Sequence, residues 1–354
     1  MYSQEDLNSA VAAGAISSDA ANALRAHVAA QRDAVPADAE HFRLITGFND
    51  IFVSIGAVIL LMAMAAIGDA IWSNNRGPSP VSGLLVAGTA WMLAEFFTAK
   101  RRMALPSIIL LLGYIGGVFF GFVGFAVEVS GVNGSDGNET LATLLISLSA
   151  LITAGAAWVH WRRFMVPITI AAGTAAIAGT LIALVVAAIG PTTQNLEEII
   201  LGLVFISGLV VFAFAMRWDM SDPRRETRRS DVAFWLHLLA APMIAHPIFA
   251  LIGVTDGDNI SAVAAVAVLA VYVAFGLIAL AVDRRALLVS ALAYVLIALA
   301  SLFRTFGAVE LNVALTALVI GSALLTLSAL WTPIRRAVVK GLPSDMQARL
   351  PATA

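Results

Sequence analysis

Ten apolar segments fill most of the chain, and short polar turns separate them. A helix that crosses the hydrocarbon core of a bilayer needs about 20 mainly apolar residues, and each segment is close to this length. Inside lipid the backbone has to satisfy its own hydrogen bonds, which a helix does within a single segment. The sequence therefore predicts an all-α polytopic membrane protein with about ten transmembrane helices. The predicted spans are 50–71, 81–99, 105–127, 141–161, 164–189, 197–216, 232–252, 261–282, 285–303 and 312–330.

Composition indicates that lipid, not water, is the solvent for these segments. Hydrophobic residues make up 60% of the chain and charged residues 12%, whereas a soluble domain is about 45–50% apolar and about 25% charged. The chain has no cysteine, which excludes disulfides and thiolate chemistry. Its net charge of -2 offers no basis for binding nucleic acid. We therefore expect the lipid bilayer to be its main partner.

Lysine and arginine gather on alternate turns, which predicts the orientation of the spans. With the N-terminus in the cytoplasm, only Arg76 and Arg304 of the 21 basic residues fall on the outer side. Short loops rich in these residues stay in the cytoplasm, so both termini are predicted to be cytoplasmic. The leader before Asp50 has no signal-peptide pattern, and the alanine-rich composition points to a bacterial inner membrane. Basic pairs recur about every 60 residues, which either a repeated helical hairpin or the plain length of two spans would produce.

A polar leader of two short helices is predicted before the first span. Gly14 can end the first helix in a left-handed conformation, and Ser17 or Ser18 can cap the second. The apolar stripe of the leader is too thin for an independent domain, so we expect it to pack on the membrane domain, another subunit or a partner. The basic, partly amphipathic tail is expected to lie at the cytoplasmic headgroups. The predicted parts are the leader 1–35, the linker 36–49, the transmembrane domain 50–331 and the cytoplasmic tail 332–354.

The leader also carries a resemblance. Its segment LNSAVAAGAISSDAANALRAHVAA, ahead of a linker and a dense run of spans, resembles bacterial multi-spanning membrane proteins of the domain-of-unknown-function type. Those proteins open with a similar pattern of helix, Gly-Ile-Ser turn and helix. The resemblance covers about 30 residues of the leader. It implies a membrane protein with a small cytoplasmic leader and transfers no site, because the family has no established activity.

Ionisable residues near the span ends are candidates for a polar site, because charges inside a membrane are costly and often functional. Asn49 and Asp50 begin the first span. Asp50 either caps that helix, at the positive end of its dipole, or belongs to such a site. Glu95 lies near the end of the second span, where it either snorkels to the cytoplasmic interface or pairs with Lys100 or Arg101; the alternative is that it binds a coupling ion or substrate.

The seventh span has the most unusual sequence, because it holds His237, His246, Pro242 and Pro247. Each proline removes a backbone hydrogen bond, so we predict a helix break at Pro242 and Pro247. Broken spans form binding sites in transporters, and imidazole titrates near neutral pH, so the histidines could relay protons. The alternative is a kink whose histidines bond to polar neighbours. The two histidines lie about 180° apart on a straight helix, which argues against a shared metal site; the sequence implies no metal or cofactor.

Two further patterns predict how the spans are held in place. Gly113, Gly117 and Gly121 recur every four residues in the third span, a small-xxx-small ridge that lets another helix approach closely. The partner helix could belong to the same chain or to another subunit, which leaves a homo-oligomer open. His160 and Trp161, next to two arginines, form an expected aromatic–basic anchor at the membrane interface.

Two classes of function fit these features. The first is a secondary transporter or permease for a small solute or ion, with proton coupling as one form; we hypothesise that Asp50, Glu95 and His237 then converge on one cytoplasmic vestibule. The alternative is a non-transporting scaffold or sensor that acts through its leader and the arginine-rich loop 217–231. An enzyme is not expected, because no nucleophile elbow, zinc-protease motif or phosphate-binding loop is present. A continuous polar cavity reaching Glu95 or His237 would favour transport, and tight pairing of these residues in a dry core would favour the scaffold.

Overall fold

The computed structural model describes residues 9–24, 47–72, 77–132, 137–222, 227–253, 261–305, 312–347 and 350. The chain divides into two compact units, Met1–His41 with Ala352–Ala354, and Phe42–Pro351. The first unit holds the leader and the second holds the apolar helices. Arg76, residues 223–226 of the arginine-rich loop and most of the predicted linker lie outside the described residues.

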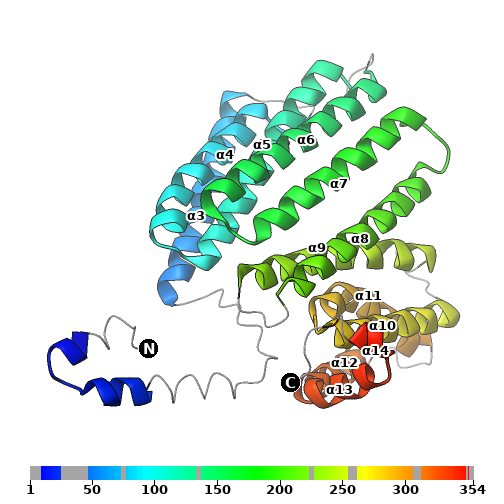
Figure 1. Cartoon of the computed structure of the whole chain (residues 1–354). Helices are drawn as coiled ribbons and strands as arrows, with labels where there is room; N and C mark the ends of the chain where they lie inside the picture. Colours follow the sequence, from blue (N-terminus) through cyan, green and yellow to red (C-terminus); the bar gives the residue numbers. More distant parts are fainter. Residues whose placement is uncertain are drawn as a thin grey trace. The chain divides into compact units, whose positions relative to one another are not determined.

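Within the described residues the second unit is built from helices alone (Figure 1). Each of the ten predicted spans coincides with one helix, and the π-helical turn η1 continues α4. The elements are α3 (Phe48–Ile71), α4 (Pro80–Ala94), η1 (Glu95–Lys100), α5 (Ala104–Ser130), α6 (Glu139–Phe164), α7 (Ile168–Ile189), α8 (Leu196–Met220), α9 (Arg228–Leu251), α10 (Ala262–Val282), α11 (Ala286–Thr305), α12 (Asn312–Ala329), α13 (Trp331–Lys340) and α14 (Ser344–Gln347).

The helices have the length and the surface of membrane spans. Among the described residues, eight helices are long and apolar enough to cross a membrane, and α12 with α13 makes a ninth if their 75° bend is counted within one span. On α3 the side chains of Phe52, Ile59 and Met62 are 71%, 62% and 68% exposed. Exposure of such apolar surface to water over whole helices would be unfavourable, whereas lipid solvates it. The prediction of an all-α polytopic membrane protein is confirmed.

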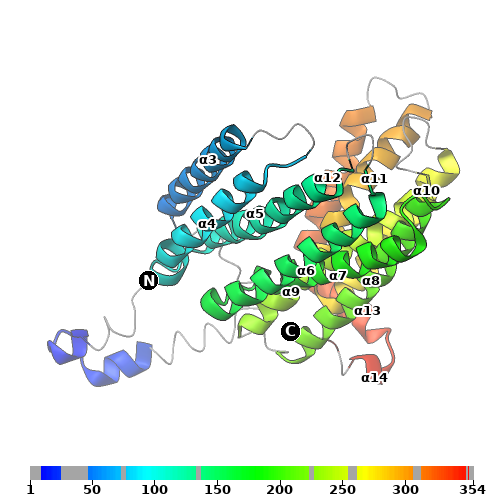
Figure 2. The ribbon, with the colours of Figure 1, turned by 90° about the horizontal axis from the view of Figure 1, so that it is seen from above.

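The helices follow the chain order across the second unit, from α3–α5 through α6–α9 to α10–α13 (Figures 1 and 2). The first group packs around a small core of mostly short side chains: Ala57, Leu61, Ala90, Ala94 and Leu110. The largest core surrounds α9, which packs against α7, α8 and α11. Its buried members include Val232, Leu236, Ala240, Phe249, Val268 and Val295.

The glycine ridge of α5 packs on α4 of the same chain, which answers the question that the sequence left open. A Cβ atom added to Gly117 would lie 2.6 Å from the Ala87 nitrogen, and one added to Gly83 would lie 2.3 Å from the Gly121 nitrogen. A Cβ on Gly113 would meet a leucine side chain of α3 at 2.7 Å. Since non-bonded atoms prefer separations of about 3.5–4.0 Å, only glycine allows the approach to backbone atoms at Gly117 and Gly83. The predicted packing role is confirmed.

The predicted helix break in the seventh span was wrong, because α9 is helical from Arg228 to Leu251 with Pro242 and Pro247 inside it. Each proline removes only one hydrogen bond, and the remaining backbone groups have no water to bond to in lipid, so the helix continues. The irregular span is instead the second one, where α4 widens into the π-helical turn η1. Such turns are rare and often mark functional positions.

The arginine-bearing ends of the helices meet at one end of the second unit, which we call the basic end. Arg163 in the last turn of α6 pairs with Glu95 at the end of α4, and Arg284 before α11 pairs with Asp219 at the end of α8. Trp235, near the start of α9, packs against the turn between α6 and α7. The alternation of basic turns in the sequence therefore corresponds to one physical end of the helices.

The leader folds locally as predicted within residues 9–24. A first helix ends at Gly14, whose φ of 70° lies in the left-handed region that favours glycine. The hydroxyl of Ser17 accepts a hydrogen bond from the Ala20 nitrogen at 3.1 Å and so caps the second helix. Most of these residues are exposed.

Candidate functional site

Buried charged and polar side chains gather where α8, α9 and the turn between α10 and α11 meet. Asp219, His237 and Arg284 are only 3%, 0% and 2% exposed. His237 Nε2 lies 2.8 Å from Asp219 Oδ2, and the Arg284 guanidinium donates to both oxygens of the same carboxylate. Arg284 also donates to the carbonyl of Ser230 at 3.2 Å and to its hydroxyl at 3.3 Å. We call these four residues the Asp219 cluster.

Each member reaches the cluster from a helix end, a turn or a buried helix face. Asp219 stands in the last turn of α8. Arg284 follows Asp283, which ends α10 in the left-handed conformation with φ 59°, a region that aspartate enters more readily than most residues. Ser230 and His237 lie about two turns apart on α9 and therefore share one face of the helix. The local geometry aims all four side chains at one point.

The protonation of the cluster follows from its hydrogen bonds. Asp219 is ionised beside Arg284 and can only accept hydrogen bonds, so His237 Nε2 carries a proton and donates it. An aspartate orients a histidine base in this way in many hydrolases. Here, however, the imidazole is fully buried and the Ser230 hydroxyl faces Arg284. The arrangement is suited to holding three segments together, not to activating a nucleophile.

The neighbouring residue of the same turn extends the network to the C-terminal helix α13. Trp331 Nε1 donates to Asp283 Oδ1 at 2.7 Å, and Arg335 Nε lies 3.5 Å from that oxygen. The Arg285 guanidinium lies 4.8 Å from the centroid of the Trp331 ring, within the range of a cation–π contact. One short turn therefore holds α8 and α9 on one side and α13 on the other.

Glu95 makes a two-point ion pair with Arg163 at the end of α6. Arg163 Nε lies 2.9 Å from Oε1 and Nη2 lies 2.5 Å from Oε2. The prediction that Lys100 or Arg101 would be its partner was wrong, because the planar guanidinium of Arg163 matches both carboxylate oxygens at once. Arg101 instead lies over the ring of Phe96. The side chains of Arg163 and Glu95 are 52% and 37% exposed, so water weakens this pair.

A second buried histidine lies among α4–α7, and the sequence interpretation of it was wrong. His160 was expected at the membrane interface, yet it is 1% exposed. Its Nδ1 shares a hydrogen bond of 3.2 Å with the Thr169 hydroxyl. The rings of Trp91, Tyr114 and Phe164 surround it at centroid distances of 6.1, 5.7 and 4.6 Å. His160 thereby joins four helices near the basic end.

The structure separates the remaining predicted site residues. Asp50 is buried in the first turn of α3, where the helix begins after Gly47, so it meets the helix dipole without being the cap itself. Asn49 beside it is exposed. His246 is exposed on α9, and its Nδ1 lies 2.6 Å from the Tyr294 hydroxyl. Since Glu95 and His237 belong to two different ion pairs, a common vestibule with Asp50 stays a hypothesis.

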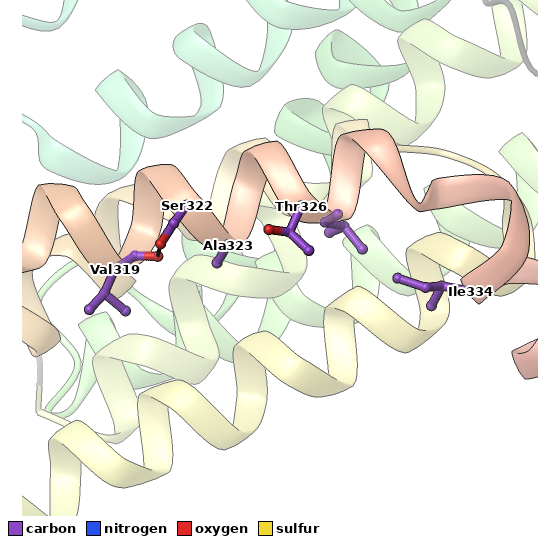
Figure 3. A pocket seen from close by; sticks show the side chains of 6 residues that line it. Val319, Ser322, Ala323, Thr326 and Ile334 are labelled. Atoms are coloured by element: carbon purple, nitrogen blue, oxygen red, sulfur yellow. Dashed lines mark hydrogen bonds between the residues drawn. The ribbon is translucent and has the colours of Figure 1, made fainter.

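An open groove of about 490 Å³ lies against α12 and α13, and neither Glu95 nor a residue of the Asp219 cluster lines it (Figure 3). Its lining is mostly apolar: Val319, Ser322, Ala323, Thr326, Leu327 and Ile334.

The fold and the buried network define a class, a polytopic helical membrane protein with ion-paired residues at one end of its helices. No protein-family model, curated protein or solved structure matches the chain.

The sequence indicated His237 as a site residue because a histidine is rare in an apolar span. Asp219 and Arg284 were missed because each counted as an ordinary charge of a turn, and only the packing of α8 against α9 shows them to be buried.

Proposed function

We propose that the protein is a multi-pass protein of the bacterial inner membrane, with both termini in the cytoplasm, and that it acts as a non-transporting scaffold or sensor. The resemblance of its leader to that of bacterial multi-spanning proteins supports the same placement. The main observation behind the proposal is that the Asp219 cluster is buried and ion-paired. His237 is fully buried, and its partner Asp219 is held by Arg284 as well.

A transporter has to expose its binding groups to each side in turn. The Asp219 cluster ties α8, α9 and the α10–α11 turn together at the basic end, which opposes such a movement. Removing one partner from a buried ion pair costs about 3–5 kcal/mol, because the other charge stays buried and uncompensated. The cluster therefore favours a transmembrane domain whose helices keep fixed relative positions. Such a domain presents its cytoplasmic surfaces to other molecules.

The leader is the surface that would engage a partner. Its two helices belong to a unit distinct from the membrane helices, and Leu24 is 43% exposed on them. The apolar surface of the described leader residues 9–24 is small, and a small surface binds with low affinity by itself, which suits reversible contact. The arginine-bearing turns of the basic end would add attraction to anionic lipid or to an acidic partner.

The second candidate is a secondary transporter or permease for a small solute or ion, with proton coupling as one form. It is favoured by His246, which is exposed at the level of the spans and hydrogen-bonded to Tyr294. The π-helical turn at Glu95 favours it too, since irregular helices are the usual sites of movement in transporters.

Proton flux separates the two candidates. The purified protein is reconstituted into liposomes that contain a pH-sensitive dye, and a proton gradient is applied with and without a membrane potential. We expect wild-type and His237→Gln proteoliposomes to give the same leak as empty liposomes. A flux that depends on the protein and disappears in a folded His237→Gln variant would reject the scaffold and support transport.

The partner contact is tested in cells with a photo-crosslinking amino acid at Leu24. We expect crosslinked products with other proteins from this position. The control position is Val129 on α5, which is 69% exposed on the apolar surface. Equal crosslinking at the two positions would contradict a specific role for the leader.

A further inference from the structure

We propose that the groove between α12 and α13 binds one acyl chain of an anionic membrane phospholipid, with its phosphate held by Arg285 at the elbow between the two helices. The inference requires only that the chain is a membrane protein, so it holds for a scaffold and for a transporter alike.

The groove exists because α12 buries only a narrow face against the core. Thr316 and Ile320 face the core and are 4% and 9% exposed. The next positions around the helix, Val319, Ala323 and Thr326, are exposed and line the groove instead. Figure 3 shows these side chains on one side of α12, with Ile334 of α13 at the end of the row.

The groove offers an apolar surface of suitable size. Its one serine, Ser322, donates its hydroxyl to the Leu318 carbonyl at 2.6 Å and so presents no unsatisfied polar group. Pockets for small ligands are about 300–1,000 Å³, and this groove is about 490 Å³. A linear hydrocarbon fits an open, elongated apolar groove along a spanning helix.

The bend after α12 places charge where a lipid headgroup would lie. α13 turns 75° away from α12, so when α12 crosses the bilayer α13 lies nearly in the plane of its surface. Its inner face is Trp331, Arg335 and Val339, all buried, and its outer face includes the exposed Lys340. Such a basic amphipathic helix is typical of contact with anionic headgroups.

Arg285 is an exposed cation beside this elbow. It lies over the ring of Trp331. Trp331 packs in the same cluster as Leu327 and Ile334, which line the groove. Arg285 therefore stands beside the end of the groove. An apolar groove that ends beside an exposed arginine is complementary to a phospholipid with net negative charge.

Binding is measured by native mass spectrometry of the full-length protein in detergent, titrated with phosphatidylglycerol or with phosphatidylcholine. We expect the first phosphatidylglycerol to bind more tightly than phosphatidylcholine. Ala323→Phe fills the groove and should weaken both lipids. Ala317→Phe, an exposed alanine of α12 outside the groove, is the matched control and should bind as the wild type does.

The headgroup contact has its own control. Arg285→Gln should weaken phosphatidylglycerol about fivefold and leave phosphatidylcholine unchanged, since a basic residue near anionic lipid contributes about 1 kcal/mol. Arg162→Gln removes a comparable exposed arginine, stacked on Trp158 at 5.3 Å, and should have no effect on the first lipid.

Several results would overturn the proposal. They are equal affinity for the two lipids, equal effects of Ala323→Phe and Ala317→Phe, or a dimer that Ala323→Phe dissociates, which would make a second copy the occupant. If Ala323→Phe does not fold, Thr326→Phe tests the same groove from the neighbouring turn. The melting temperature of each variant in lipid-free detergent shows whether it is folded.

Discussion

The contact between α4 and α5 should make Gly83→Ala destabilising although alanine is the better helix former. The added Cβ would lie 2.3 and 2.4 Å from the nitrogen and Cα of Gly121. These are backbone atoms, so no side chain can rotate away, and the helices have to separate by about 1 Å to restore ordinary contact. Overpacking of this kind costs about 1–3 kcal/mol, against a gain of about 1 kcal/mol in helix propensity. We expect a net loss of up to about 2 kcal/mol in the free energy of unfolding.

The measurement is reversible unfolding of the purified protein in mixed micelles, with tryptophan fluorescence as the signal. Gly88→Ala is the matched control, because Gly88 lies on the same helix with no atom within 4 Å of its added Cβ. It should be neutral or slightly stabilising. On α5, Gly117→Ala and Gly116→Ala form a second pair with the same contrast. If Gly83→Ala were as stable as Gly88→Ala, the close helix contact would not exist in the folded protein.

Three further predictions test the ion pairs, the C-terminal helix and the topology. Asp219→Asn should lower the free energy of unfolding by about 3–5 kcal/mol, because it leaves a buried arginine uncompensated. Glu95→Gln removes a partly exposed pair and should lower it by only about 0.2–1 kcal/mol. Equal losses for the two variants in the same assay would contradict the burial of the Asp219 cluster. Trp331→Phe removes the hydrogen bond to the α10–α11 turn, so hydrogen exchange of α13 should accelerate, and unchanged exchange would show that the bond does not hold the helix. The chain contains no cysteine, so single cysteines introduced at Ser221 and Thr193, at opposite ends of α8, can be labelled separately. A membrane-impermeant maleimide added from outside should label only the Thr193→Cys variant. Equal labelling of the two variants would reject the proposed orientation.

The spans were predictable from the sequence because lipid imposes a simple rule on each segment separately. A run of about 20 apolar residues becomes a helix whatever its neighbours do, since its backbone has no other way to satisfy its hydrogen bonds. The glycine ridge and the caps at Gly14 and Ser17 were also local patterns, in which a residue and its near neighbours determine the conformation. The end of α6 was less predictable: the fifth span was expected to begin at residue 164, but Phe164 still belongs to α6, and Met165 with φ 53° ends it.

Partnerships between distant residues were decided by the tertiary structure alone. Glu95 binds a residue 68 positions away and Asp219 one 65 positions away, and periodicity within one span carries no information about which face meets which helix. The two prolines of α9 suggested a break that the lipid-like environment and the surrounding helices suppress. Sequence therefore determined the solvent, the helices and the alternation of their basic ends, because these depend on composition along the chain. Packing decided which charges became buried, because burial depends on what lies beside a residue in space.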